Sequence, residues 1–347
     1  MNVSEIQSGM ISLSDLQVPP EINKIGEEVI KAIAFTLIPV ELAYFSIYFH
    51  TKGVSRLFKI LTFLSLVTCW ISLVLAPISC GPARCLQHLA IAIGTMKLLD
   101  IWARQDSLPT YTAGSKPPDW KLALMLLTEL RYESFTPNSI RVLRKQENFN
   151  EPLQLALHTL AFAFLQSLPQ NHSTILAFEV LLAIYIIWTC MQMALRYKSS
   201  PALFGPLYLA DSLTGFWSET WHNAFASPCT SLIYAPIRHG LPKLGFPIVL
   251  ARSLGVIGAF GLMALFHVFA FSPILSNEAL KRIAIFFLLN GVATVAEAMV
   301  WGRRKHWMKA GLAWGFETAL ASWTASGVDI PNGLGKIDWV GACRSRS

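Results

Sequence analysis

Eight apolar windows spread along nearly the whole chain constrain its fold more than any other feature. Each comes close to the length needed to cross a hydrocarbon core of about 30 Å. Hydrophobic residues make up 53% of the 347 residues and charged residues only 14%, whereas soluble domains are about a quarter charged. The sequence therefore predicts an all-α polytopic membrane protein with about eight transmembrane helices. The windows run over about 30–50, 58–78, 86–102, 152–168, 174–194, 246–271, 281–301 and 311–327.

The windows leave no room for a separate globular unit, so one multispanning domain is expected over residues 29–328. A polar segment, 1–28, precedes this domain and a tail, 329–347, follows it. The first segment is acidic and has no short apolar core before a small-residue cleavage site. No cleavable signal peptide is therefore predicted, and the first helix is expected to serve as the signal.

The basic residues indicate an orientation in the membrane. The chain has 28 Lys and Arg against 21 Asp and Glu, a formal net charge of +7, and most of the basic residues lie in loops that eight spans would place on one side. The positive-inside tendency then predicts both termini in the lumen of the endoplasmic reticulum. This loop pattern argues against a nucleic-acid partner. The sequons at Asn2 and Asn171 fall on the lumenal side, where glycosylation is possible.

Six cysteines are scattered without a CxxC pair, which indicates neither a zinc site nor a disulfide scaffold. Cys80 and Cys85 share one predicted lumenal loop. Two unlinked thiols are the favoured interpretation, and a disulfide between them is the alternative. No group of His, Cys and carboxylate residues has metal-ligand spacing, so no metal is expected.

His267 lies inside the apolar run 253–272, where an imidazole without a partner is costly and therefore calls for a reason. Catalysis is the favoured reason and packing the alternative. His158 lies in a comparable run, 155–162, but has no motif around it. For His158 packing is favoured.

A second histidine, His222, ends the aromatic-rich stretch Ser212-LTGFWSETW-His222, and Asn223 follows it. Trp217 and Trp221 are four residues apart, which would place them on one face of a helix. A site role is the favoured interpretation of this segment, and an ordinary interfacial aromatic belt is the alternative. The stretch resembles the SL-x-x-FW-x-x-x-WH element of the wax synthase-like branch of the membrane-bound O-acyltransferase superfamily. The resemblance covers mainly residues 200–330.

The resemblance implies the roles of several residues. His267 corresponds to the catalytic histidine of that branch, which acts as a general base on an acceptor hydroxyl that attacks an acyl-CoA thioester. Such proton transfer contributes about 10² to 10⁴ in rate. His222 and Asn223 would orient or polarise the acyl carbonyl. The remaining substrate-binding candidates are Trp217, Trp221 and Glu317.

The partners implied are an acyl-CoA as co-substrate, with no bound cofactor, a lipophilic alcohol and membrane lipid. The closest resemblance is to fungal enzymes that O-acetylate terpenoid or meroterpenoid alcohols in secondary metabolism, which implies acetyl-CoA. The chain departs from the pattern at 218–220 and around Leu265-Phe266-His267-Val268, so the acyl group and the acceptor stay open. The oligomeric state is also open.

A basic cytosolic surface is the candidate site for the CoA phosphates, and ordinary positive-inside charge or anionic-lipid contact is an equal alternative. Its residues are Arg131, Arg141, Arg144 and Lys145.

Two alternative functions stay open, one of the same class and one of a different class. A wax ester synthase would use a long-chain acyl-CoA and a fatty alcohol. A transporter would use the intramembrane His and Glu residues as a proton relay, but no inverted repeat with matching broken helices supports it. GxSxG, P-loop, HExxH, HxxxD and GxGxxG motifs are missing, which disfavours serine hydrolases, ATPases, zincins and nucleotide-dependent redox enzymes.

Overall fold

The computed structural model describes residues 20–139, 150–195, 201–302, 306–328 and 343. Helices dominate this part of the chain, and its sheet consists of two antiparallel strands of two residues each. The predicted all-α membrane protein is confirmed. The elements are α1 (Pro20–Thr51), α2 (Ser55–Leu75), α3 (Gly81–Ala103), β1 (Thr110–Tyr111), α4 (Asp119–Thr128), β2 (Phe135–Thr136), α5 (Glu151–Gln166), α6 (Ser173–Leu195), η5 (Leu207–Leu209), α7 (Leu213–Gly215), η6 (Phe216–Thr220), α8 (Ala226–Pro228), η7 (Cys229–Tyr234), α9 (Ala235–Gly240), η8 (Leu241–Leu244), α10 (Ile248–Phe271), α11 (Asn277–Trp301) and α12 (Trp307–Ala325).

A helix lies in each of the eight predicted windows. Five segments of the described chain are long and apolar enough to cross a membrane. They are Asn23–Thr51, Ser55–Leu75, Ser173–Ala194, Ile248–Phe271 and Asn277–Trp301. The other three helices are not among these five segments. The α5 helix has only 16 residues, whereas α3 and α12 bury charged side chains such as Lys97 and Glu317. For these three, membrane crossing stays a prediction.

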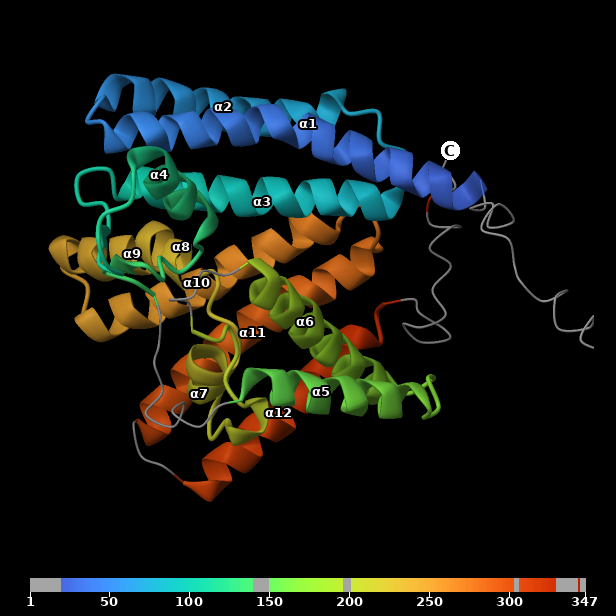
Figure 1. The fold of residues 1–347 in the computed structure, drawn as a ribbon. Helices are drawn as coiled ribbons and strands as arrows, with labels where there is room; N and C mark the ends of the chain where they lie inside the picture. The colour runs from blue at the N-terminus through green and yellow to red at the C-terminus, as the bar shows by residue number, and fades with distance from the viewer. Residues whose placement is uncertain (1–19, 140–149, 196–200, 303–305, 329–342, 344–347) are drawn as a thin grey trace, which may run out of the picture.

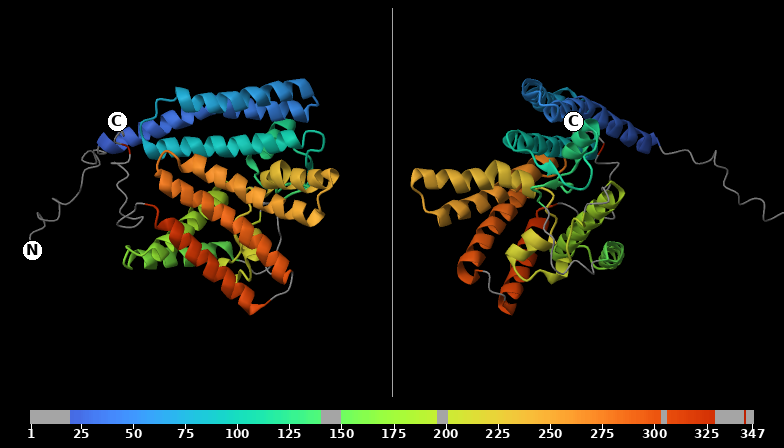
Figure 2. Two further views of the ribbon diagram at one scale, coloured as in Figure 1. Left: turned by 180° about the vertical axis from the view of Figure 1, so that it is seen from behind. Right: turned by 60° about the vertical axis from the view of Figure 1, so that its left-hand side comes forward.

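The helices pack in a continuous series. In Figure 1, α1, α2 and α3 form one layer at the top, and α10, α11 and α12 cross below it. The α3 helix contacts both α1 and α10, so it joins the two groups, and α12 contacts α6, which in turn packs against α5. The view from behind in Figure 2 shows the same layering. The helix α10, which carries His267, therefore lies between α3 and α11 in this series.

One end of the bundle brings together segments from both ends of the chain. The Glu28 carboxylate accepts hydrogen bonds from the Ser79 and Cys80 backbone N–H groups at 2.6 and 3.2 Å. Cys80 forms a disulfide with Cys343, while Cys85 is a free, buried thiol. The expectation that Cys80 is an unlinked thiol is wrong. Its partner is distant in sequence, and only the fold brings the two sulfurs together.

Small residues allow α10 and α11 to approach their neighbours closely, as is usual between helices in membranes. A Cβ atom added at Gly291 of α11 would lie 3.0 Å from the Phe260 Cβ atom of α10. A Cβ atom added at Gly255 of α10 would lie 2.8 Å from the Tyr234 ring of η7. The close α10–α11 contact brings the face of α11 that precedes Gly291 within reach of His267.

A buried carboxylate holds the segment after α7 against α3. Asp100 of α3 is fully buried, and its oxygens accept hydrogen bonds from the Tyr132 hydroxyl at 2.9 Å and the Ser227 hydroxyl at 2.6 Å. Ser231 donates to the same carboxylate, and Arg104 forms an ion pair with it at 2.8 Å. Three chain segments that are distant in sequence therefore converge on Asp100.

Candidate functional site

His267 has one ring nitrogen engaged, while the other forms no hydrogen bond with the described residues. Its Nδ1 atom lies 2.8 Å from the Met263 carbonyl oxygen, one turn earlier on α10. Because a carbonyl oxygen only accepts hydrogen bonds, Nδ1 carries the proton of the neutral imidazole, and Nε2 is then the acceptor nitrogen. The ring is half-buried and stacks on the Phe287 ring of α11, with the centroids 4.3 Å apart.

His158 shows that this tautomer alone does not identify a base. Its Nδ1 atom lies 2.7 Å from the Gln154 carbonyl oxygen, and its ring stacks on the Tyr185 ring at 4.0 Å. The two histidines therefore have the same local geometry. They differ in the ring that each stacks on, because the Phe287 ring that stacks on His267 also lies 6.1 Å from the Trp217 ring of the motif, whereas the Tyr185 ring that stacks on His158 contacts Phe204.

The motif 212–222 has a specific local conformation. Ser212 caps α7, because its hydroxyl accepts a hydrogen bond from the Gly215 N–H group at 2.9 Å. Phe216–Thr220 then forms a π-helical turn, and Trp221 is extended. The expectation that Trp217 and Trp221 share one face of an α-helix is therefore wrong in its geometry, although their rings still meet edge to face at 6.3 Å. Single π-helical turns occur frequently at functional sites.

Trp217 links the motif to α11 and α12. Its indole Nε1–H group lies 3.0 Å from the Asn290 Oδ1 atom and 2.8 Å from the Glu317 Oε1 atom. Asn290 is fully buried, and Glu317 is 8% exposed. The structure thus brings two of the predicted site residues, Trp217 and Glu317, into direct contact. It adds Asn290, whose only sequence signal was a carboxamide inside an apolar span.

A second contact anchors the start of the motif. The Glu297 carboxylate accepts hydrogen bonds from the backbone N–H groups of Leu213 and Thr214 at 2.7 and 3.1 Å. Lys309 of α12 lies 3.6 Å from the same carboxylate. A carboxylate at the first turn of a helix satisfies N–H groups that have no partner within the helix. Glu297 therefore fixes the position at which α7 begins.

These contacts come from one face of α11. Phe287, Asn290 and Glu297 are spaced by three and seven residues, which places them on the same side of an α-helix. They contact His267, Trp217 and α7, respectively. One rigid helix thus sets the position of the motif relative to His267.

His222 lies in an aromatic enclosure. Its ring is 5.2 Å from the Trp221 ring, 5.4 Å from the Phe204 ring and 6.0 Å from the Trp188 ring of α6. Its buried Nδ1 atom makes no hydrogen bond with the described residues. Burial, and to a smaller extent the charges of His267 and Arg131, lowers the pKa of His222 to about 3. His222 is therefore neutral near pH 7.

Asn223 and Arg131 form a structural contact instead of an open binding surface. The Arg131 side chain is 2% exposed, and its guanidinium donates to the Asn223 Oδ1 atom at 3.1 Å and the Pro201 carbonyl oxygen at 2.8 Å. Glu133 pairs with it at 2.9 Å. The prediction of a basic surface at Arg131 is wrong, because its charge is buried and satisfied internally. The other residues of that prediction, Arg141, Arg144 and Lys145, lie outside the described residues.

Comparison with known proteins finds a similarity in the segment that contains this arrangement. Residues 200–289 match the model of the membrane bound O-acyl transferase family. This segment includes both His222 and His267.

The relatives found are plant proteins. One from Arabidopsis thaliana, described as probable long-chain-alcohol O-fatty-acyltransferase 7, is 29% identical over 170 residues, or 46% of this chain and 48% of the relative. Another, described as probable long-chain-alcohol O-fatty-acyltransferase 9, is 33% identical over 113 residues, or 32% of each chain. The chain spans about half the length of the first relative and about a third of the second. The predicted wax synthase-like resemblance is confirmed, whereas the terpenoid-acetylating branch stays a prediction.

Proposed function

We propose that this protein is a membrane-bound O-acyltransferase that moves an acyl group from an acyl-CoA to the hydroxyl of a lipophilic alcohol. The observation that carries the proposal is the arrangement of His267 against the same face of α11 that holds the Trp217 motif, with no hydrogen bond from the described residues to its acceptor nitrogen Nε2. The family domain over 200–289 supports the reaction class.

In the proposed reaction His267 acts as the general base. Its Nε2 atom takes the proton of the acceptor hydroxyl as the hydroxyl oxygen attacks the thioester carbon. The tetrahedral intermediate then collapses, the carbon–sulfur bond breaks, and the imidazolium returns the proton to the departing thiolate. The hydrogen bond from Nδ1 to the Met263 carbonyl oxygen fixes the orientation of the ring, and the partial negative charge of that oxygen stabilises the imidazolium during this cycle.

His222 has a different proposed role. A neutral imidazole has one N–H group, and an N–H group aimed at the thioester carbonyl oxygen would stabilise the negative charge that develops there. Its lowered pKa makes it a poor base at neutral pH but leaves this donor role intact. Trp217 and Glu317 hold the motif in place through their hydrogen bond.

The proposal also covers the identity of the acyl donor and of the acceptor alcohol. We take acetyl-CoA and a terpenoid or meroterpenoid alcohol as the first choice, on the residue pattern around the motif. The alternative is a long-chain acyl-CoA with a fatty alcohol, and the names of the plant relatives favour it. A proton-relay transporter is less well supported, because Glu297 and Glu317 bind the motif instead of lining a path of free carboxylates.

The proposal includes a location and an orientation. The protein would lie in the endoplasmic reticulum membrane, with Glu219 and the start of α7 toward the cytosol, where acyl-CoA is present. The polyanionic CoA would approach from the water side, whereas an apolar alcohol partitions into lipid and would enter between helices.

The test uses microsomes that contain the full chain, supplied with either radiolabelled acetyl-CoA or radiolabelled palmitoyl-CoA. Each is combined with a panel of terpenoid alcohols or with hexadecanol. Labelled terpenyl acetate supports the first choice, and labelled wax ester supports the alternative. No labelled ester from any combination, with the protein present in the membrane in normal amount, would overturn the acyltransferase proposal.

A further inference from the structure

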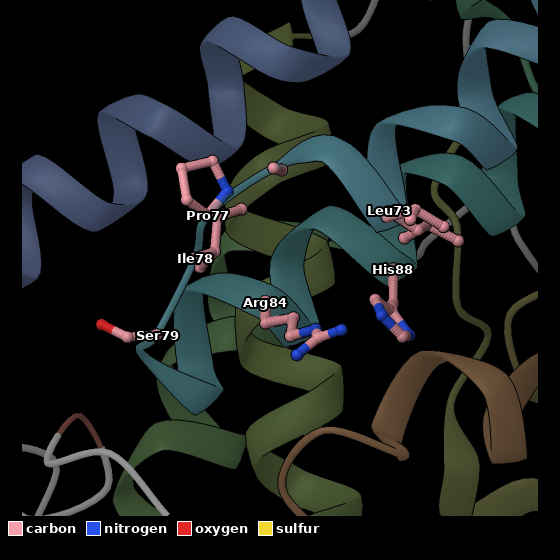
Figure 3. A pocket seen from close by; sticks show the side chains of 8 residues that line it. Leu73, Pro77, Ile78, Ser79, Arg84 and His88 are labelled. Atoms are coloured by element: carbon pink, nitrogen blue, oxygen red, sulfur yellow. The ribbon is translucent and has the colours of Figure 1, made fainter. Parts of the chain in front are cut away.

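A groove opens at the end of the bundle that holds the Cys80–Cys343 disulfide, far along the chain from the motif. It lies between the last turn of α2, the turn 76–80 and the start of α3, and has a volume of about 580 Å³. Figure 3 shows its lining. One wall is apolar and the other carries two nitrogen-containing side chains; the residues used below are Leu73, Val74, Pro77, Ile78, Arg84 and His88.

Arg84 supplies a free positive charge. It is exposed, and its guanidinium forms no ion pair or hydrogen bond with the described residues. His88 follows it by four residues on α3, so the two side chains lie on one face of the helix. Figure 3 shows both side chains on the same side of α3.

His88 supplies a buried acceptor without a donor. The residue is 9% exposed, and its Nδ1 atom lies 3.0 Å from the Phe269 carbonyl oxygen. Nδ1 therefore carries the proton of the neutral ring, as in His267, and the lone pair is on Nε2. This Nε2 atom is buried and has no hydrogen-bond partner among the described residues. An unsatisfied buried acceptor is unfavourable, so a ligand that donates a hydrogen bond here would be favoured.

We propose that this groove binds an anionic phospholipid whose head group carries a hydroxyl. The phosphodiester pairs with the Arg84 guanidinium, and the head-group hydroxyl donates a hydrogen bond to the His88 Nε2 atom. Because Nε2 is buried, the hydroxyl reaches it only when a lining side chain such as Leu73 is displaced. The acyl chain lies along the end of α2, where Val74 is 85% exposed.

The combination of charges and apolar surface selects this ligand class. A free phosphate would leave the apolar wall uncovered, and a choline head group has no hydrogen-bond donor for Nε2. Phosphatidic acid matches Arg84 but has no head-group alcohol for His88. The His88 ring also stacks on Phe269, with centroids 4.7 Å apart, so the bound lipid would lie against the last turns of the helix that carries His267.

The test measures lipid binding to the purified full chain in detergent, by native mass spectrometry and by thermal unfolding. The probes are phosphatidylglycerol, phosphatidic acid and phosphatidylcholine of the same acyl composition, and water-soluble sn-glycerol 3-phosphate. The expected order of affinity is phosphatidylglycerol, then phosphatidic acid, then phosphatidylcholine, with no binding of the soluble phosphate. Catalysis is not part of the readout.

Two variants separate the two contacts. Arg84→Gln is expected to lower the affinity for both anionic lipids about fivefold, which is the usual effect of one cation near a membrane surface. His88→Asn keeps a donor toward the Phe269 carbonyl oxygen but removes Nε2, and is expected to abolish only the preference for phosphatidylglycerol over phosphatidic acid. Lys281→Gln, an exposed cation at the start of α11, is the matched charge control and should change neither.

Three outcomes would overturn the proposal. Equal affinity of wild-type protein for all three lipids would remove the groove as a selective site. An equal loss in Arg84→Gln and Lys281→Gln would assign the effect to general surface charge. Binding of sn-glycerol 3-phosphate as tight as that of phosphatidylglycerol would indicate a site for a soluble phosphate ester instead of a lipid.

Discussion

Replacing His267 with phenylalanine separates its chemistry from its packing. The phenylalanine ring is similar in size to the imidazole and can stack on Phe287, whose ring centroid lies 4.3 Å from that of His267. It lacks Nε2. If Nε2 is the general base, the rate of transfer should fall by about 10² to 10⁴. This corresponds to about 3 to 5 kcal/mol in the barrier.

The expected cost to folding is smaller. The variant loses the hydrogen bond from Nδ1 to the Met263 carbonyl oxygen, which contributes about 1 kcal/mol. His267→Ala would lose the ring stacking as well, so it should abolish transfer but destabilise the fold more. The phenylalanine variant is therefore the cleaner test of chemistry.

The assay is the initial rate of ester formation from radiolabelled acyl-CoA in proteoliposomes, at matched protein amounts. Thermal unfolding is followed in parallel by tryptophan fluorescence. His158→Phe is the matched control, because His158 has the same Nδ1 contact to a carbonyl oxygen and a stacked ring. Its rate should not change. A His267→Phe rate within a few-fold of wild type, or an equal loss in both variants, would refute the role of Nε2.

Four further predictions concern the motif. His222→Ala should lower the rate less than His267→Ala, since it removes a proposed carbonyl contact and not the base; equal and complete losses in correctly folded variants would favour a two-histidine mechanism. Because the folded-state pKa of His222 is lowered to about 3, the unfolded chain binds a proton near pH 6.5 that the folded chain does not. Acidification from pH 7 to pH 5 should therefore lower the free energy of unfolding, and His222→Phe should reduce this dependence in pH-dependent thermal unfolding; an unchanged dependence would contradict it. Glu297→Ala should destabilise the protein by about 3 kcal/mol, because it leaves Lys309 and two backbone N–H groups of α7 without their acceptor. Glu297→Gln should destabilise it less. The measurement is the midpoint of thermal unfolding, and equal midpoints for Glu297→Ala and wild type would show that α7 does not depend on this contact. A cysteine at position 219, which is exposed, should be labelled by an impermeant maleimide from the cytosolic side of sealed microsomes, and labelling only after lumenal access would invert the orientation.

The sequence indicated the two histidines and Trp217 as candidate site residues because each breaks a local pattern. An imidazole in an apolar span and a dense aromatic run are visible without any tertiary information. The same reasoning failed for Arg131, because positive charge in a loop does not reveal whether the side chain is exposed or buried. In the structure Glu133, Asn223 and backbone carbonyl groups surround its guanidinium.

Residues on α11 were harder to assign. Asn290 contacts Trp217 across 73 positions of sequence, and Glu297 contacts Leu213 across 84. Helical periodicity shows that Phe287, Asn290 and Glu297 share a face. It does not show which neighbour that face meets, because an apolar span presents hydrophobic side chains all around its axis.

The sequence by itself determined that the chain consists of helices and where most of them lie. Backbone groups in lipid must be hydrogen-bonded within their own segment, so a long apolar run has the α-helix as its available structure. Tertiary structure alone decided which side chains meet. The rotation of each helix and its choice of neighbour depend on close packing at positions such as Gly291 and on long-range contacts such as those of Glu297 and the Cys80–Cys343 disulfide. No local pattern contains these contacts, since each requires two segments that are distant in sequence to be in place at once.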